Sequence, residues 1–167
     1  MSKTINNLGK AFAGESQANR RYLAFAAKAE AEGHSQIARI FRAAADAETV
    51  HALNHFRVMG GVSSTKENLQ EAISGENYEY TQMYPPFINQ AKKDENAEAV
   101  QVLSWANSVE KVHETLYKKA LEVLEKGEEL KEKNVFVCQT CGYTVSGEAP
   151  EACPICGAHQ EKFKEVM

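Results

Sequence analysis

Two short motifs in this chain combine a carboxylate with an imidazole. Glu48 precedes His51 by three residues, and Glu110 precedes His113 by the same interval. Residues three apart lie on one face of an α-helix, one turn from each other, so each motif directs both side chains into the same space. Carboxylate and imidazole groups together suit iron and other transition metals. The two motifs therefore indicate metal-centred chemistry.

The motifs belong to an internal repeat. Glu110 follows Glu48 by 62 residues, and Gly75-Glu76 follows Gly14-Glu15 by 61. Each half of the repeat offers an early glutamate and a later Glu-x-x-His. Converging glutamates and histidines on the helices of a four-helix bundle form carboxylate-bridged dinuclear metal sites. Glu79, one helical turn after Glu76, has no acidic counterpart in the first half and makes the expected ligand set asymmetric.

The four cysteines all fall within one C-terminal segment. Cys138 and Cys141 form one C-x2-C pair, and eleven residues separate them from the second pair, Cys153 and Cys156. This spacing predicts a tetrahedral site with four thiolate ligands, and a segment of about 34 residues needs such a metal to hold its fold. Iron and zinc both accept four thiolates, and the spacing does not choose between them.

The bulk composition excludes several classes of protein. The chain has 167 residues and a formal net charge of −4, with acidic and basic residues mixed throughout. No basic cluster suggests a nucleic-acid partner. No apolar stretch reaches the ~18–20 residues that span a bilayer, and the first residues lack the apolar run of a signal peptide. We therefore expect a soluble, cytoplasmic protein without a membrane or nucleic-acid partner.

Four amphipathic segments must position the bundle ligands. In each of them apolar residues recur at intervals of three and four, which is the spacing of a core-facing stripe on an α-helix. The candidate ligands interrupt these stripes and so face the interior of the expected bundle. The predicted helices cover residues 3–31, 35–59, 65–87 and 95–126.

Local signals mark the ends of these helices. Ser35 suits the N-cap of the second helix and Asp94 the N-cap of the fourth, and residues 64–67 form a capping box before the third. Pro85 and Pro86 lack backbone N–H donors, so we expect them to kink or break the third helix one turn beyond the metal site.

These elements predict two domains. An all-α four-helix bundle would occupy residues 1–127, and a small metal domain with strand-forming Val135-Phe136-Val137 would occupy residues 134–167. The intervening residues 127–133, mostly Gly, Glu and Lys, suit a solvated linker.

Taken in this order, the motifs resemble those of the rubrerythrin family over essentially the whole chain. The matching bundle motifs are Gly14-Glu15, Glu48-x-x-His51, Gly75-Glu76-x-x-Glu79 with Met83-Tyr84-Pro85, and Glu110-x-x-His113. The tail, which resembles rubredoxin, contains Cys138-x-x-Cys141-Gly142-Tyr143 and Cys153-Pro154-x-Cys156-Gly157. The resemblance implies a ferritin-like bundle that binds two iron ions, fused to a rubredoxin-like domain that binds one. It also implies the reduction of hydrogen peroxide to water.

The symmetry of the repeat suggests which candidate ligands bridge the two metal ions and which bind only one. Glu48 and Glu110 would bridge the two metal ions, and Glu15 and Glu76 would each bind one of them. The two histidines would bind at opposite ends of the pair.

Four residues are expected to act in catalysis. The resemblance implies that His51 and Glu79 exchange as ligands of one iron when its oxidation state changes, which is reasonable because a more positive ion favours a carboxylate. Tyr22 and Tyr84 lie about two helical turns beyond the early glutamates and are candidate hydrogen-bond donors to ligating carboxylates. Packing of both tyrosines in the core is the competing interpretation.

Peroxide reduction consumes two electrons, which the cysteine-bound iron would supply one at a time. The sequence contains no Gly-rich dinucleotide loop, so we expect a separate rubredoxin or reductase to bring the electrons, ultimately from NAD(P)H. One competing interpretation is a ferroxidase or iron-storage protein, and another is a zinc-ribbon regulator whose bundle binds metal incidentally. A storage protein has no need of a one-electron relay, so the cysteine segment favours the peroxidase.

The connection between the second and third helices is short. In a ferritin-like bundle these helices are parallel, so a connector within one chain must climb roughly 33–37 Å, counted at ~1.5 Å per helical residue. The six Cα steps from Met59 to Thr65 reach at most about 22 Å, which is too short unless about a turn of helix unwinds near Gly60. An antiparallel arrangement of the two helices would fit the length but would abandon the ferritin-like topology that the motifs suggest. We therefore expect a homodimer in which the first two helices of one chain complete the last two helices of its partner.

Overall fold

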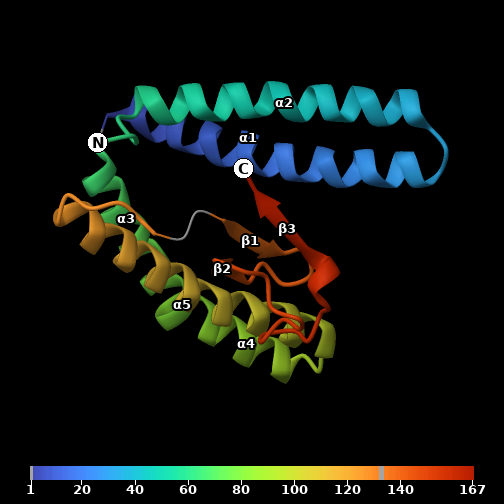
Figure 1. Ribbon diagram of the computed structural model, residues 1–167. Helices are drawn as coiled ribbons and strands as arrows, with labels where there is room; N and C mark the ends of the chain where they lie inside the picture. The colour runs from blue at the N-terminus through green and yellow to red at the C-terminus, as the bar shows by residue number, and fades with distance from the viewer. Residues whose placement is uncertain (1, 132–133) are drawn as a thin grey trace. The chain divides into compact units, whose positions relative to one another are not determined.

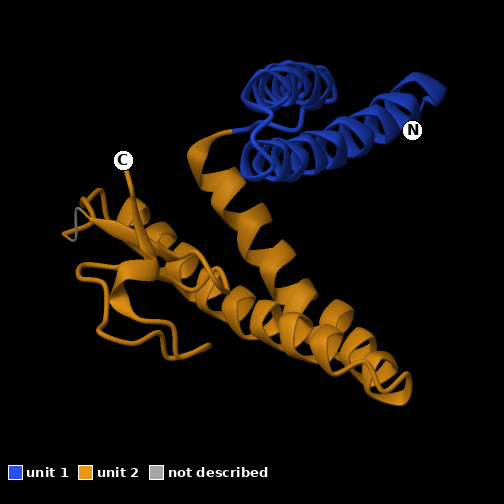
Figure 2. Ribbon diagram, turned by 90° about the vertical axis from the view of Figure 1, so that its right-hand side faces the viewer, with its two compact units in different colours: residues 1–63 blue, residues 64–167 orange. Residues whose placement is uncertain are grey.

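The computed structural model describes residues 2–131 and 134–167, and within them it contains five α-helices and one small β-sheet. Figure 1 shows the order of these elements along the chain. They form two compact units, Met1–Ser63 and Ser64–Met167, which are coloured separately in Figure 2. The boundary falls in the short connector between the second and third helices.

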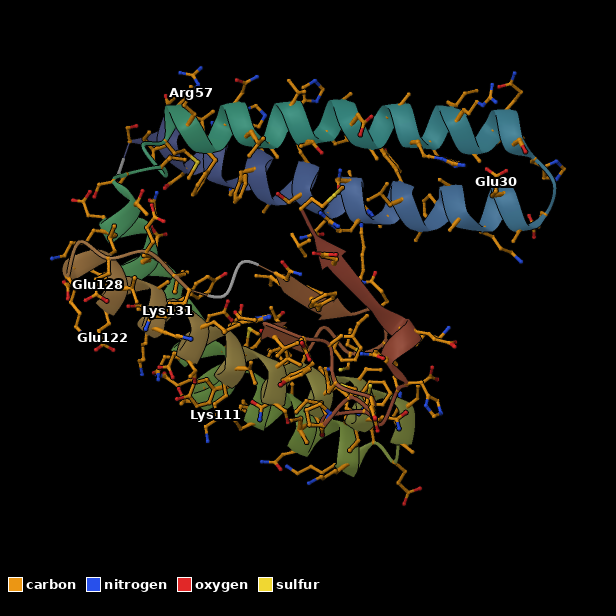
Figure 3. The ribbon with its side chains drawn as sticks, viewed as in Figure 1. Glu30, Arg57, Lys111, Glu122, Glu128 and Lys131 are labelled. Carbon is orange, nitrogen blue, oxygen red and sulfur yellow. The ribbon has the colours of Figure 1, made fainter. Side chains whose placement is uncertain are left out.

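The first unit is a helical hairpin. α1 (Lys3–Ala31) and α2 (Ser35–Val58) lie side by side and antiparallel (Figure 1). Both ranges agree with the predicted helices. Near the turn that joins them, the Glu30 carboxylate, labelled in Figure 3, accepts a hydrogen bond from Arg42. This ion pair ties the end of α1 to the start of α2.

Alanines line the contact between α1 and α2. The buried apolar positions of the hairpin are Ala18, Ala26, Ala29, Ala38, Ala45 and Ala52. Asn19 is buried among them, and its amide donates hydrogen bonds to the Ala45 carbonyl at 2.7 Å and to the Thr49 hydroxyl at 2.9 Å. These bonds fix how far along its axis α1 lies against α2.

Large apolar side chains of the hairpin remain exposed. Ile40 and Leu53 on α2 are 69% and 60% exposed, and Phe25 on α1 is 47% exposed. A pair of helices buries only the strip along its own seam, so an apolar surface of this size requires further helices to cover it.

The second unit begins with a nearly continuous helical segment. α3 (Thr65–Tyr78) starts at the predicted capping box, in which Ser64 and Glu67 satisfy each other's backbone N–H groups. A π-helical turn, η1 (Glu79–Met83), follows directly, and α4 (Tyr84–Lys93) completes the segment.

The π-helical turn has a local cause in the two prolines. Pro85 and Pro86 carry no backbone N–H, and a proline ring collides with the carbonyl four residues earlier in a regular α-helix. In the widened turn the Tyr84 N–H bonds to the Glu79 carbonyl, five residues earlier. The helix therefore continues through the prolines by widening, and it does not end there.

The C-terminal segment forms a small antiparallel sheet. β1 (Val135–Cys138) pairs with β2 (Thr144–Ser146) on one side and β3 (Phe163–Val166) on the other, which gives the strand order β2-β1-β3. The strand expected from its β-forming residues is thereby confirmed. β2 contacts α5 (Ala97–Glu125), which also packs on α3, η1 and α4. The sheet is thus attached to the helix that carries Glu110.

Two predicted N-caps are wrong. His34 occupies the N-cap position of α2, and the Ser35 hydroxyl instead donates to the Glu30 carboxylate at 2.8 Å. Asn96 caps α5 by accepting a hydrogen bond from a backbone N–H, whereas Asp94 ends α4. Ser35 is instead the first residue of α2, and Asp94 is the C-cap of the preceding helix.

The expected linker is only partly described. Residues 127–131 form a turn and irregular backbone, and residues 132–133 lie outside the described residues. The division into domains at residues 1–127 and 134–167 stays a prediction, since the compact units divide the chain after Ser63. In the described part of the chain, no helix has the length and apolar character needed to cross a bilayer.

Candidate metal centres

Three predicted ligands converge within the first unit. Glu15 on α1 and Glu48 and His51 on α2 each place a ligand atom within 4.8 Å of the others, and we call this group the N-terminal half-site. His51 Nδ1 lies 2.9 Å from Glu48 Oε2, one helical turn away. The His51 side chain is 54% exposed, so the half-site is open on that side.

The second unit contains a matching group, the C-terminal half-site. Glu76 on α3 and Glu110 and His113 on α5 place their ligand atoms within 4.8 Å of one another. His113 Nδ1 lies 2.8 Å from Glu110 Oε2 and 3.7 Å from Glu76 Oε1. Both halves of the sequence repeat therefore form the same constellation, an early glutamate against a Glu-x-x-His turn.

Burial and mutual repulsion shift the pKa values of the C-terminal half-site. Burial, and then the Glu110 carboxylate, raise the pKa of Glu76 to about 7. The hydrogen bond to Glu110 raises the pKa of His113. The pKa of Glu79 is raised as well, by burial first and then by Glu110. Carboxylates that resist ionising together favour a bound cation, because its charge removes their repulsion.

Glu79 stands beside this group and is not part of it. It is the first residue of the π-helical turn, and its carboxylate feels the charges of Glu110 and His113. The cluster within 4.8 Å includes Glu76, Glu110 and His113 only, among the residues that the structure describes. The role of Glu79 as a metal ligand therefore stays a prediction.

The π-helical turn determines the face on which Tyr84 lies. Tyr84 follows Glu76 by eight residues, which in a regular α-helix would rotate it about 80° away from that glutamate. A π-turn adds one residue to the helix, so Tyr84 lies only about 20° from the Glu76 direction. Burial, and then the carboxylates of Glu110 and Glu79, raise the pKa of Tyr84. Its hydroxyl therefore stays protonated beside the half-site.

Tyr22 has an aromatic environment. Its ring centroid lies 6.3 Å from those of Phe25 and Phe41. Such packing matches the competing interpretation of Tyr22 as a core residue, and its role as a donor to a ligating carboxylate stays a prediction. Tyr22 follows Glu15 by seven residues, so the π-turn gives Tyr84 the equivalent place in the second half.

Four thiols converge in the C-terminal domain. Their sulfur atoms all lie within 4.8 Å of one another, and none forms a disulfide: Cys138, Cys141, Cys153 and Cys156. The Sγ–Sγ distance is 3.7 Å between Cys138 and Cys156, and 3.5 Å between Cys141 and Cys153. A tetrahedron with metal–sulfur bonds of ~2.3 Å has edges of about 3.8 Å, so the cluster has the size of a four-thiolate metal site.

Two similar turns hold these thiols. The Gly142 N–H bonds to the Cys138 carbonyl at 2.9 Å, and the Gly157 N–H bonds to the Cys153 carbonyl at 2.9 Å. Both glycines have a positive φ, 86° and 75°, which other residues adopt only with strain. Burial alone would raise the pKa of Cys138, but hydrogen bonds from backbone N–H groups outweigh it and lower the pKa to about 7. Burial raises the pKa values of Cys141 and Cys156. The thiols therefore do not all ionise readily by themselves, and a bound cation would favour all four thiolates.

Sequence analysis missed Thr144, which connects the two kinds of site. Its hydroxyl oxygen lies 3.0 Å from His113 Nε2, and the hydroxyl donates to the Gly142 carbonyl at 3.1 Å. The contact joins residues 31 positions apart, one on α5 and the other on β2. No periodicity or motif marks such a pair in the sequence.

A buried carboxylate, Glu114, was also missed. Glu114 is 6% exposed and receives hydrogen bonds from Asn77 at 2.9 Å, Lys118 at 2.8 Å and the Tyr80 hydroxyl at 3.3 Å. Lys118 is the main cause of its lowered pKa. Asn77, Tyr80 and Glu114 each directly follow a predicted ligand in the sequence, which is the signal that could have identified them. The network pins α3 and η1 to α5 beside the half-site.

Comparisons with known proteins agree with this geometry. The sequence model of the rubrerythrin family matches residues 6–121. The model of the rubredoxin-like domain of rubrerythrin matches residues 136–164. Rubrerythrin-2 of Clostridium acetobutylicum is 35% identical, covering 96% of this chain and 95% of the relative. Rubrerythrin of Porphyromonas gingivalis is 38% identical, covering 99% and 90%. The solved structure of fully reduced, all-ferrous nigerythrin has a TM-score of 0.59 and 33% identity, covering 99% of this chain and 88% of that one.

Proposed function

This chain belongs to the rubrerythrin family, and from that membership we propose that it reduces hydrogen peroxide to water at a di-iron centre. It is an oxidoreductase of oxidative-stress defence, with two iron ions in its bundle and a third on its four cysteines. The observation that carries the proposal is the presence of both donor sets, a carboxylate–histidine set and a four-thiolate set, in one chain.

The side chains fit these metals. Glutamate and histidine are the donors found in di-iron carboxylate proteins with four-helix bundles. Burial, and then the nearby Glu110 carboxylate, raise the pKa of Glu76, and a bound cation would offset both effects. Four sulfur atoms 3.5–3.7 Å apart match a tetrahedral ion with thiolate ligands.

Cleavage of hydrogen peroxide into two waters consumes two electrons and two protons. When bound, a ferrous pair supplies both electrons together and so avoids release of a hydroxyl radical. The chain's own part is to hold the ions and to deliver protons. We assign the bridging positions to Glu48 and Glu110 and the terminal positions to Glu15 and Glu76, following the symmetry of the repeat.

We propose that His51 and Glu79 replace each other as ligands of one iron when its oxidation state changes. His51 is half exposed on the open side of its half-site, and Glu79 lies at a π-turn next to Glu110 without joining the compact group. The physical reason for the exchange is that a more positive iron favours a carboxylate over a neutral imidazole. Burial, and then the Glu110 carboxylate, raise the pKa of Glu79, which favours its protonated form when it is not a ligand. The protonated Tyr84 hydroxyl is a second donor, and Tyr22 is its counterpart in the first half.

Electrons reach the pair from outside the protein. The four cysteines would hold a one-electron iron centre, to which a separate rubredoxin or reductase would bring electrons, so the proposed activity is that of an indirect NAD(P)H peroxidase. Thiolate ligands must stay reduced to hold this iron, and we therefore expect the protein to work in the cytoplasm.

Metal analysis followed by rapid mixing tests the function. The reduced protein is mixed once with hydrogen peroxide and once with oxygen, and oxidation of the bundle is followed by absorbance. A peroxidase is oxidised faster by peroxide, whereas a ferroxidase or iron-storage protein is oxidised faster by oxygen. Faster reaction with oxygen, or none with peroxide, would overturn the proposal. A colourless four-cysteine centre would instead indicate zinc.

Two substitutions separate the roles of the metal centres. Glu110→Ala is expected to abolish peroxide turnover and to leave the red colour of the oxidised thiolate-bound iron intact. Cys141→Ser is expected to abolish turnover with an external donor, although the chemically reduced bundle still reacts once with peroxide. Full steady-state activity of the Cys141→Ser protein would show that the four-cysteine centre is not the relay.

We further propose that two chains build each di-iron centre by exchanging helix pairs. The two half-sites belong to different compact units, and the connector between α2 and α3 is too short to climb a ferritin-like bundle. The hairpin α1–α2 has an alanine seam and leaves large side chains such as Ile40 and Leu53 exposed. A partner's α3–α5 would cover this surface and complete the site, which makes a homodimer the functional form.

A further inference from the structure

We propose that Thr144 couples the four-cysteine centre to the C-terminal half-site within one chain, by fixing the ring of His113. The proposal rests on the peroxidase function and identifies the residue through which the electron relay acts. Thr144 is a positioning residue, because it touches a metal ligand and not the substrate.

The orientation of the His113 ring is the first observation. Its Nδ1 faces the carboxylates of Glu110 and Glu76, at 2.8 and 3.7 Å, and is therefore the nitrogen available to a metal. Its Nε2 points the other way and lies 3.0 Å from Thr144 Oγ1. A histidine that binds a metal usually donates its second N–H to a fixed acceptor, which sets the ring orientation and strengthens the ligand. Here that acceptor is a hydroxyl of the rubredoxin-like domain.

The position of the Thr144 hydroxyl is the second observation. Thr144 donates its own proton to the Gly142 carbonyl at 3.1 Å, so its oxygen is left to accept from His113. Gly142 is covalently bonded to Cys141, one of the four thiolates. Two hydrogen bonds and a few covalent bonds thus connect the cysteine ligand to the histidine ligand.

The electron balance of this connection is simple. With iron bound at both sites, one electron would pass from the four-cysteine site, where ferrous iron would become ferric, to the pair, where one ferric iron would become ferrous. A one-electron carrier protein then re-reduces the four-cysteine iron. Two such transfers restore the electrons that one peroxide molecule consumed, and no atom is exchanged between the domains.

Further contacts hold the turn at Gly142 and the residue Thr144 against α5. The turn at Gly142 lies against the buried Val109 of α5, since a Cβ at Gly142 would be 3.8 Å from Val109 Cγ1. Thr144 and His113 also border a cavity of about 290 Å³ whose lining includes Leu116, Ala120 and Val135. Hydrogen bonds are stronger in such apolar surroundings than in water.

Three variants isolate the hydroxyl. Thr144→Val keeps the shape of the side chain and removes the hydroxyl, and Thr144→Ser keeps the hydroxyl. Ser146→Ala is the matched control, because Ser146 lies on the same strand and borders the same cavity. All three variants should retain the four-thiolate absorption, since none of these residues is a ligand.

The first measurement is the transfer of electrons from the reduced four-cysteine iron to the oxidised pair. After the fully reduced protein is mixed with peroxide, we expect Thr144→Val to slow the reappearance of red colour about 10- to 100-fold, the usual range for loss of a partner to a metal ligand. The initial oxidation of the pair by peroxide should be unchanged. Thr144→Ser should restore the transfer, and Ser146→Ala should not affect it. An unchanged rate in Thr144→Val would overturn the proposal.

The second measurement does not depend on activity. In the zinc-loaded protein, which is diamagnetic, nitrogen-15 NMR of labelled histidines reports the His113 Nε2–H. We expect a hydrogen-bonded, slowly exchanging proton in the native protein and in Thr144→Ser, and its loss in Thr144→Val. An identical signal in all variants would show that Thr144 is not the acceptor. This measurement also separates the two proposals, since it gives the same answer if the bundle fails to react with peroxide.

Mixed dimers test whether the transfer runs within one chain. Chains with Cys141→Ser are refolded together with chains with Glu110→Ala, and turnover with an external donor is measured. If the transfer runs within a chain, the intact half-site and the intact cysteine centre lie on different chains, and the mixture stays inactive. Recovery of activity would show that electrons cross between chains and would overturn the proposal.

Discussion

Glu76 links metal binding to pH. Its pKa of about 7 means that the metal-free protein holds a proton on this carboxyl near neutral pH, and a metal ion must displace that proton. We expect the affinity of the bundle for zinc to rise steeply between about pH 6 and about pH 8, as measured by competition with a chromophoric chelator. The control is Glu71→Gln, an exposed residue of the same helix, which should leave the pH dependence unchanged. A flat pH profile in the native protein would contradict this role.

The same carboxyl makes the metal-free fold sensitive to alkali. The folded protein binds its Glu76 proton more tightly than the unfolded chain, so the free energy of unfolding falls as pH rises from about 4.5 to above 7. His113 acts in the same direction, because its raised pKa gives stability at low pH that is lost as it deprotonates. We expect a loss of up to about 3 kcal/mol, seen as a lower melting temperature of the metal-free protein. Glu76→Gln should flatten the dependence.

Glu114 is expected to stabilise the second unit. Glu114→Ala leaves Asn77, Tyr80 and Lys118 without their acceptor and should lower the free energy of unfolding by about 1–3 kcal/mol. Chemical denaturation measures this loss. Glu122→Ala is the control on the same helix. Glu122, labelled in Figure 3, is exposed and pairs across one turn with Lys126, so its loss should lower the free energy of unfolding much less than the loss of Glu114.

Residue spacing predicted which candidate ligands come together better than it predicted the residues that support them. Glu48 and His51 face the same way, because both their spacing and their helix are local properties of the sequence, and the internal repeat pointed to Glu15 on the neighbouring helix. Thr144 and Glu114 act through contacts between elements that lie far apart in the chain. Such contacts depend on how helices and strands pack, and a single sequence carries no direct record of that packing.

At the scale of elements, the π-helical turn is expected to trade stability for function. Replacing both Pro85 and Pro86 by alanine allows a regular α-helix, which would rotate Tyr84 by about 100° away from the half-site. We expect an equal or higher melting temperature and a peroxide turnover reduced to that of Tyr84→Phe.

The matching control is a triple variant that combines the two proline substitutions with Tyr84→Phe. If the prolines act only by placing Tyr84, adding Tyr84→Phe to the double alanine variant should cause no further loss of turnover. A further loss would mean that Tyr84 still reaches the site without the prolines, and that the turn has another role.

The ends of the elements show where local signals compete. The capping box at Ser64 was predicted correctly because its two partners lie within one turn. Ser35 was wrongly predicted as a cap because Glu30 takes its hydroxyl. The widened turn at Glu79 was not predicted, although the prolines that cause it were recognised. Sequence showed that a regular helix could not continue, and did not show whether it would end or widen.

At the scale of the whole molecule, helix exchange can be tested by complementation. Chains with Glu48→Ala and chains with Glu110→Ala are refolded together and assayed for peroxide turnover. In an exchanged dimer one site carries both substitutions and the other carries none, so activity should reappear, at up to about half the native value in a mixed dimer.

The unexchanged alternative gives the opposite result. Every site would then carry one substitution, and the mixture would stay inactive. Each variant refolded alone provides the baseline, and native chains treated in the same way show how much activity refolding recovers. Sedimentation of the mixture confirms that dimers formed.

The alanine seam of the hairpin has a consequence for the geometry of the metal pair. A seam of small, similar side chains is nearly smooth, so sliding α1 by one turn along α2 would cost little packing. Such a slip would carry Glu15 about 5.4 Å away from Glu48 and His51, far beyond the tolerance of a coordination bond. The Asn19 amide donates a hydrogen bond to the Ala45 carbonyl at 2.7 Å and so opposes this sliding. The spacing of candidate metal ligands on neighbouring helices is thereby set by an amide outside the candidate site.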